Sequence, residues 1–134
     1  MKPFVMKQSM RTIGGAFYPT GYAVLMLGPN ENLEEIGQKL EQAGFDGQRL
    51  MHLSPETVMR DIGKMQGESD LPLPSVGTEG KTVSRFVELA REGYQGLMVP
   101  APEDEDTERL MQALQDVPIT YGQKYHMLAI EDLT

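Results

Sequence analysis

Short apolar runs and amphipathic stretches alternate along this chain, and their order predicts the elements of its fold. The run GYAVLML (residues 21–27) ends at a Gly-Pro pair, and its length favours a buried strand over a helix. Leu33, Ile36 and Leu40 follow at helical spacing, and the asparagines before them can cap a helix. We therefore expect a strand followed by a helix that ends at Gly44.

The rest of the chain continues this alternation with one interruption, a connection rich in Gly, Pro and Ser. The further expected elements, in chain order, are a strand (48–54), a helix opened by Ser54 and Pro55, the connection (67–80), a helix (81–93), a strand (96–102), a helix (102–117) and a closing strand from Tyr121 to Ile130. Two strand-helix-strand units therefore enclose two extra helices and a loop.

The two units resemble each other in detail. Laying residues 23–45 on 97–119 without gaps makes apolar positions coincide, including Ile36 with Leu110. Either an internal repeat or the shared demands of two amphipathic units explains this likeness. We expect one α+β domain over residues 21–134, a ferredoxin-like split βαβ sandwich with strand order 4-1-3-2 and helices packed on one face.

Basic residues gather at the N-terminus of an otherwise acidic chain. Residues 1–20 contain Lys2, Lys7 and Arg11 and no acidic residue, whereas the whole chain has a net charge of −8. An acidic body repels phosphates, and three basic residues fall short of the clustered positive charge typical of nucleic-acid binding. We expect residues 1–20 to form a basic N-terminal arm that docks onto its own or a neighbouring subunit, and we expect no nucleic-acid partner.

The composition excludes several classes of site. The chain contains no cysteine, which rules out disulfides, thiolate metal sites and cysteine nucleophiles. No apolar run approaches the about 18 residues that a membrane-spanning helix needs, and the N-terminus lacks the apolar core of a secretory signal. We therefore expect a cytoplasmic protein without a membrane partner.

Five residues stand out as weak candidates for ligand binding: His52, Lys81, Tyr121, Tyr125 and His126. The expected strand order puts the two histidines on opposite edges of the sheet, so they cannot meet within one subunit. The tyrosines suit strands by propensity and are more typical of packing than of ligand contacts. We expect no catalytic residue, no metal site and no cofactor.

Two segments match known ligand loops incompletely. Gly80, Lys81 and Thr82 end like a phosphate loop that opens a helix, but Ser75 stands where the first glycine belongs. The segment PEDEDTE (102–108) lacks the alternating ligands and the central glycine of a calcium loop. Ordinary helix N-termini explain both segments better than ligand sites do.

The expected strands are apolar on both faces, although the helices of this fold cover only one. Either the N-terminal segment with Phe4, Val5, Phe17 and Tyr18 folds over the second face, or a second sheet packs there. Because such a patch is seldom left exposed on a monomer, we expect a homodimer held through the open sheet face.

Two long segments carry a resemblance to a known family. They are NLEEIGQKLEQAGFDGQRLMHLS (32–54) and REGYQGLMVPAPEDEDTERLMQALQDV (91–117), which leads to YGQKYHMLAIEDL (121–133). The pattern covers residues 21–133 and resembles the heat-induced general stress protein family (17M type), short bacterial domains of ferredoxin-like build. The resemblance implies a stress-associated role without established chemistry, and it transfers no catalytic residue.

Two hypotheses about function stay open. The first is a non-enzymatic dimeric interaction or regulatory module, and the second is a small-molecule-binding or catalytic dimer with a pocket between subunits. Some short bacterial sequences of this kind carry a riboflavin-biosynthesis label, but the GTP-opening enzyme of that pathway uses cysteine zinc ligands, which this chain lacks. We favour the first hypothesis; a closed pocket that brings His52, Tyr125 or His126 toward polar partners would favour the second.

Overall fold

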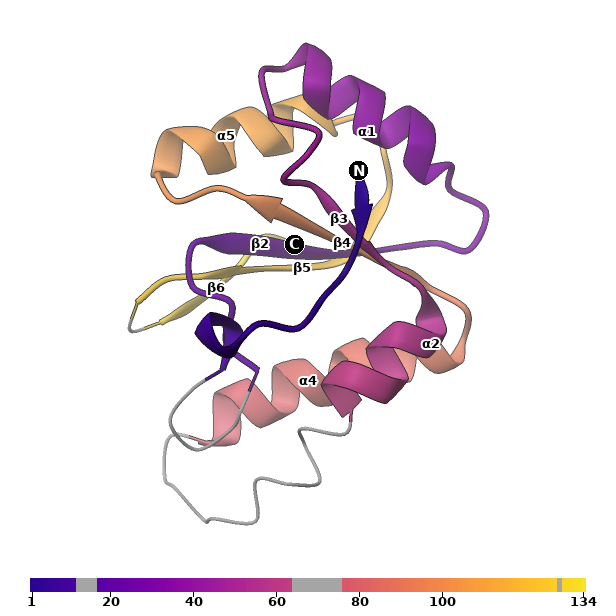
Figure 1. Ribbon diagram of the computed structural model, residues 1–134, viewed down its shortest axis with the longest axis vertical. Coiled ribbons are helices and arrows are strands. Elements are labelled where there is room, and N and C mark those ends of the chain that lie inside the picture. The colour runs from indigo at the N-terminus through magenta and orange to yellow at the C-terminus, as the bar shows by residue number, and fades with distance from the viewer. Residues whose placement is uncertain (12–16, 64–75, 128) are drawn as a thin grey trace.

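In the described part of the chain, six strands form one mixed sheet at the centre, and helices lie against both of its faces (Figure 1). The computed structural model describes residues 1–11, 17–63, 76–127 and 129–134. The elements are, in chain order, β1 (Lys2–Pro3), η1 (Gln8–Met10), β2 (Tyr22–Leu27), α1 (Leu33–Gln42), β3 (Met51–Leu53), α2 (Pro55–Thr57), η2 (Val58–Ile62), α4 (Val76–Arg91), β4 (Gln95–Pro100), α5 (Asp104–Ala113), β5 (Ile119–Tyr125) and β6 (Ile130–Asp132).

The four central strands lie in the order β3-β4-β2-β5, and each runs antiparallel to its neighbours among them. They correspond to the four strands expected from the sequence, so their order is the predicted 4-1-3-2. The sequence does not predict the two outer strands: β1 pairs parallel with β3, and β6 pairs antiparallel with β5. The chain is therefore an α+β protein whose sheet extends beyond the expected strands at both edges.

The prediction that helices cover only one face of the sheet is wrong. The helices α1 and α5 lie against one face, and α2 and α4 lie against the other (Figure 1). Neighbouring residues of β2 enter two separate cores, because Leu25 and Leu27 pack with α1 and α5 whereas Val24 and Met26 pack with η2 and α4. Strands that are apolar on both faces need cover on both, and the chain between the two halves supplies it.

The helix α1 begins and ends at the signals that the sequence carries. Asn32 caps it, because its side-chain oxygen accepts hydrogen bonds from two backbone N–H groups of the first turn (3.0 and 3.2 Å). Gly44 follows the last turn with φ of +100°, a conformation that glycine adopts without strain. The backbone N–H of Phe45 then donates to the carbonyl of Leu40 (3.0 Å) and closes the helix end.

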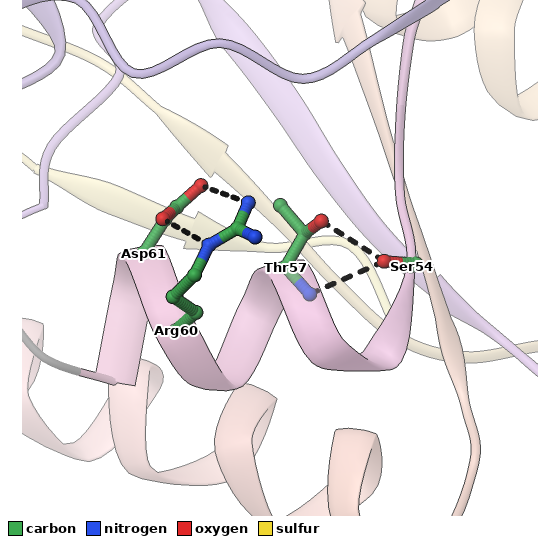
Figure 2. A network of polar contacts seen from close by, with 4 residues as sticks. All are labelled: Ser54, Thr57, Arg60 and Asp61. Atoms are coloured by element: carbon green, nitrogen blue, oxygen red, sulfur yellow. Dashed lines mark hydrogen bonds and ion pairs between the residues drawn. The ribbon is translucent and has the colours of Figure 1, made fainter.

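The helical stretch of α2 and η2 starts at the predicted Ser-Pro signal. The Ser54 hydroxyl accepts a hydrogen bond from the Thr57 backbone N–H (3.2 Å) and shares one with the Thr57 hydroxyl (2.9 Å; Figure 2). Further along, the guanidinium of Arg60 donates two hydrogen bonds to the carboxylate of Asp61 (3.0 and 3.3 Å; Figure 2). These hydrogen bonds, together with the negative charge of Asp61, raise the pKa of Arg60 above its ordinary value. Local polar contacts thus support a stretch whose apolar residues enter the core.

The helix expected from Lys81 is α4, and it begins earlier than predicted, at Val76. The predicted connection (67–80) therefore gives way to helix before it ends, and its first part lies outside the described residues. Glycines at 77 and 80 conceal this start, because glycine is a poor helix former and reads as a loop residue. Val83, Phe86 and Val87 of α4, which follow these glycines, belong to the core on this side of the sheet.

The closing strand expected over residues 121–130 is a hairpin. The strand β5 ends at Tyr125, the backbone N–H of His126 donates to the carbonyl of Ala129 (2.8 Å), and β6 runs back beside β5. The apolar residues near the turn continue the pattern of a strand, so hydrophobicity alone does not show where the chain reverses.

The described part of the predicted arm packs onto the sheet. Backbone N–H groups of Lys2 and Phe4 donate to the carbonyls of Leu50 (2.8 Å) and His52 (2.9 Å), so β1 extends the edge next to β3. Phe4 and Phe17 are buried in the core on the α4 side, with ring centroids 6.3 Å apart. The sheet face expected to be open for a homodimer is therefore filled by helices and by the N-terminal segment of the same chain.

Candidate functional site

A groove of about 610 Å³ lies between α1 and the sheet edge formed by β1 and β3. We call it the α1 groove. It is lined by Met1, Leu33, Glu34, Gly37, Gln38, Glu41 and His52. It therefore contains one of the five residues that the sequence singles out, His52.

His52 reaches the groove because of its position in a strand. It is the middle residue of β3, and its neighbours Met51 and Leu53 are buried in the core on the α4 side. Successive side chains of a strand point to opposite faces, so His52 lies on the face that α1 covers. Its side chain is partly exposed there, and its ring forms no hydrogen bond or ion pair with any described residue.

The shape of the groove depends on a glycine in the middle of α1. A Cβ atom at Gly37 would lie only 3.0 Å from Cε of Met1, closer than ordinary van der Waals contact. The absence of a side chain at Gly37 lets Met1 pack across the helix. Met1 and the partly buried Leu33 thus form the apolar part of the lining.

The polar part of the lining comes mainly from one stripe of α1. Glu34, Gln38 and Glu41 recur at spacings of four and three residues, which places them on one side of a helix. All three side chains are exposed, and none of the described residues that line the groove is a Lys or Arg. The two carboxylates give this surface a negative character, which favours positively charged groups.

His126 lies away from the α1 groove. Its Nε2 is 2.8 Å from Oε1 of Glu131 on β6, and its backbone carbonyl accepts a hydrogen bond from the Tyr18 hydroxyl (2.7 Å). The strands β4 and β2 separate β3, which carries His52, from β5, which His126 follows. The prediction that the two histidines do not meet within one chain is confirmed, although β1 and β6, and not their own strands, form the edges of the sheet.

The two candidate tyrosines belong to the core on the α4 side. Tyr125 is fully buried and lies edge-on against Phe17 (5.9 Å between ring centroids) and Tyr18 (5.0 Å). Tyr121 is partly buried and lies edge-on against Phe86 of α4 (5.4 Å). Their rings stabilise the packing of the second face, as aromatic residues of a strand commonly do.

Lys81 is exposed and lies inside α4, not at its start. The expectation that Gly80, Lys81 and Thr82 open a helix is therefore wrong, because the helix already begins at Val76. The backbone N–H groups available to an anion are those of the first turn, so this segment is not placed like a phosphate loop.

The described residues offer few alternatives to the α1 groove as a chemical site. Among them, no group of three His, Cys, Asp or Glu side chains could hold a metal ion. In the same residues, no helix has the length and apolar character needed to cross a membrane. A further groove, of about 470 Å³, lies between α5 and β6 and is lined by acidic residues together with Thr107, Met111 and Leu133.

The sequence analysis missed the residues of α1 that accompany His52. A signal for them exists in the sequence, because a polar stripe runs beside a glycine in the interior of an otherwise regular helix. What the sequence does not show is that Met1 and His52 meet this stripe, since the contact joins segments far apart in the chain.

No protein family model, no curated protein and no solved structure matches this chain. The resemblance to the heat-induced general stress protein family therefore stays a prediction. We infer the function from the geometry of the chain itself.

Proposed function

We propose that this protein is a non-enzymatic interaction module that binds its partner in the α1 groove. The observation that carries the proposal is the composition of the lining, in which two carboxylates, a carboxamide and an imidazole surround an apolar part. The carboxylates attract a positively charged group of the partner. An apolar group attached to it is removed from water when it packs against Met1 and Leu33. The preferred partner is therefore a basic segment of another protein with an apolar residue beside its Lys or Arg.

The surroundings of the histidines support binding over catalysis. A nucleophile or general base is normally oriented by a second group within hydrogen-bond distance. The ring of His52 has no such partner among the described residues. Nε2 of His126 has one, Oε1 of Glu131 at 2.8 Å, but His126 lines neither the α1 groove nor the groove between α5 and β6. The residue with an oriented ring is therefore not the residue that lines the candidate site.

The volume of the groove supports a second candidate, the binding of a small molecule. Pockets for small ligands typically enclose about 300–1,000 Å³. The α1 groove, with about 610 Å³, falls within this range and is formed by a single chain. A small cationic ligand would use the same carboxylates as a basic protein segment.

We further propose a ferredoxin-like core, a stress-associated role and a cytoplasmic location for this chain. The order of the four central strands supports a ferredoxin-like core, to which β1, β6 and the second helix layer are additions. The stress-associated role and the cytoplasmic location follow from sequence reasoning alone. A homodimer would have to use a surface other than the faces of the sheet, because helices cover both (Figure 1).

The proposal can be tested by NMR titration of the ¹⁵N-labelled full chain with two pools of acetylated, amidated tetrapeptides. One pool combines Lys or Arg with Leu or Val, and the other replaces the basic residues by Asp or Glu. We expect the basic pool to shift the amide signals of Gly37, Gln38 and His52, and the acidic pool to leave them unchanged. His52→Ala should reduce the shifts without unfolding the chain, because the side chain is only partly buried.

Three outcomes would count against the proposal. The first is that neither pool shifts the groove signals at millimolar concentration. The second is that the acidic pool shifts them as much as the basic pool does. The third is that the shifted signals lie outside α1 and β3. If butylamine alone shifts the same signals as strongly as the basic pool, the second candidate is favoured, because the peptide then adds nothing to recognition.

A further inference from the structure

A second groove, of about 200 Å³, lies on the face of the sheet that carries Met51, beside the N-terminal segment. Lys2, Lys7 and Arg49 line it, and none of the described residues in its lining is acidic. We call it the basic groove. Tyr22, at the start of β2, also lines it.

A lining of this kind is unusual for this chain, which has 20 acidic and only 12 basic residues. The arginines at 60, 85 and 109 each form an ion pair with a carboxylate one to three residues away. Within the described ranges, Lys2, Lys7 and Arg49 form no ion pair. Three cations that have no carboxylate partner among the described residues thus meet at one groove and create a local positive potential on an acidic protein.

The backbone holds two of these cations in place from different parts of the chain. The N–H of Lys2 donates to the carbonyl of Leu50 (2.8 Å), which ties β1 to the start of β3. The N–H of Arg49 donates to the carbonyl of Asp46 (3.0 Å) in the turn before β3. The carboxylate of Asp46 accepts a hydrogen bond from the backbone N–H of Gln48 (2.9 Å), so this neighbouring acid contacts its own turn. The groove is therefore a consequence of the fold and not of a local run of basic residues.

We propose that the basic groove binds a small ligand through a phosphate group. The guanidinium of Arg49 can donate two parallel hydrogen bonds to phosphate oxygens, and the ammonium groups of Lys2 and Lys7 can donate to the others. The phenol of Tyr22 and the carboxamide of Gln48, which also line the groove, add neutral donors. The volume is below the about 300 Å³ at which pockets for larger ligands begin, so it suits one or two phosphate groups with a small attached group.

Isothermal titration calorimetry of the full chain with pyrophosphate tests this proposal, with ionic strength held constant by sodium chloride. We expect saturable binding to one site. Arg49→Gln and Lys7→Gln should each weaken it by about tenfold or more, because each removes a charge-assisted hydrogen bond. The matched controls are Arg85→Gln and Lys39→Gln, which remove the same charges from exposed positions outside the groove and should change the affinity by less than about twofold.

Comparison ligands separate the possible sources of binding. Inorganic phosphate should compete with pyrophosphate, and succinate should bind at least about tenfold more weakly, because its carboxylates match the donors less well. Absence of pyrophosphate binding at millimolar concentration, equal losses in the groove and control variants, or equal affinity for succinate would each overturn the proposal. Tighter binding of duplex DNA than of pyrophosphate would overturn the assignment to a small ligand. The four substituted side chains, those of Lys7, Lys39, Arg49 and Arg85, are all exposed, so replacing them should leave the core intact. Thermal unfolding followed by circular dichroism verifies that each variant is folded.

Discussion

Phe17 provides a sharp test of how the second face of the sheet is covered. Its side chain is fully buried, and its ring lies edge-on against Phe4 and Tyr125, with centroid distances of 6.3 and 5.9 Å. Phe17→Ala should lower the free energy of unfolding by about 3–5 kcal/mol, the usual cost of removing a buried aromatic ring. That figure includes about 0.5–1.5 kcal/mol for each edge-to-face pair that is lost. Because a domain of this kind has a total stability of about 5–15 kcal/mol, the change is easily measured.

The assay is urea unfolding followed by far-UV circular dichroism, since the chain has no tryptophan. Val5→Ala is the control, because Val5 belongs to the same segment but is 63% exposed, and it should cost less than about 0.5 kcal/mol. The unfolding midpoint should be independent of protein concentration, because the chain covers its own sheet. A loss below about 1 kcal/mol for Phe17→Ala would show that Phe17 does not hold the N-terminal segment against the sheet. A midpoint that rises with concentration would show that a second subunit supplies the cover.

Substitutions at three further positions test local features by the same urea assay. Lys124 is 1% exposed and forms no ion pair with any described residue, so Lys124→Met, which keeps the apolar stem, should leave the free energy of unfolding unchanged or raise it; a decrease would show that the amine is needed. Ser54→Ala should cost about 1 kcal/mol through loss of the helix cap, whereas Ser54→Asp should retain most of the stability. Gly44→Ala should cost about 1 kcal/mol or more because of the φ of +100°, and an unchanged midpoint would contradict this.

The order of the central strands could be predicted because local signals mark where the helices between them begin and end. Asn32 and Gly44 mark the two ends of α1, and Ser54 marks the start of α2. These signals work through backbone hydrogen bonds within a few residues, so they can be read without knowledge of the tertiary structure. With the elements in place, two strand-helix-strand units admit few arrangements.

The outer strands and the second helix layer could not be predicted for the opposite reason. The sequence at Lys2 and Pro3 has no strand character, and β1 exists because the N–H groups of Lys2 and Phe4 reach carbonyls at the edge of β3. The second helix layer depends on contacts of α4 and η2 with strands far away in the chain, because residues of α4, η2, β2 and β4 share one core. The outer strands and the second layer are thus decided by contacts between distant segments, whereas the early start of α4 is hidden by the low helix propensity of glycine.

The candidate site shows the same division. The separation of His52 from His126 follows from strand order, and the sequence predicts it. The α1 groove does not follow from strand order, because it needs Met1 to pack over Gly37 and the polar stripe of α1 to stand above β3. Burial of Tyr125 in the core likewise depends on Phe17, more than a hundred residues earlier in the chain.

Glu34 and Glu35 allow the most direct test of the proposed function. They are neighbours in the first turn of α1, both are exposed, and the Asn32 side chain accepts a hydrogen bond from the backbone N–H of each. Only Glu34 lines the α1 groove. Glu34→Gln and Glu35→Gln thus have the same effect on the net charge and on the charge of the first helical turn. They differ only in whether the lost carboxylate lines the groove.

The measurement is the Kd of the strongest basic tetrapeptide for each variant, taken from NMR titrations at physiological salt. We expect Glu34→Gln to weaken binding about two- to fivefold, as is usual for the loss of one exposed ion pair, and Glu35→Gln to leave the Kd unchanged within error. Equal weakening in the two variants would show that recognition depends on net charge and not on the α1 groove.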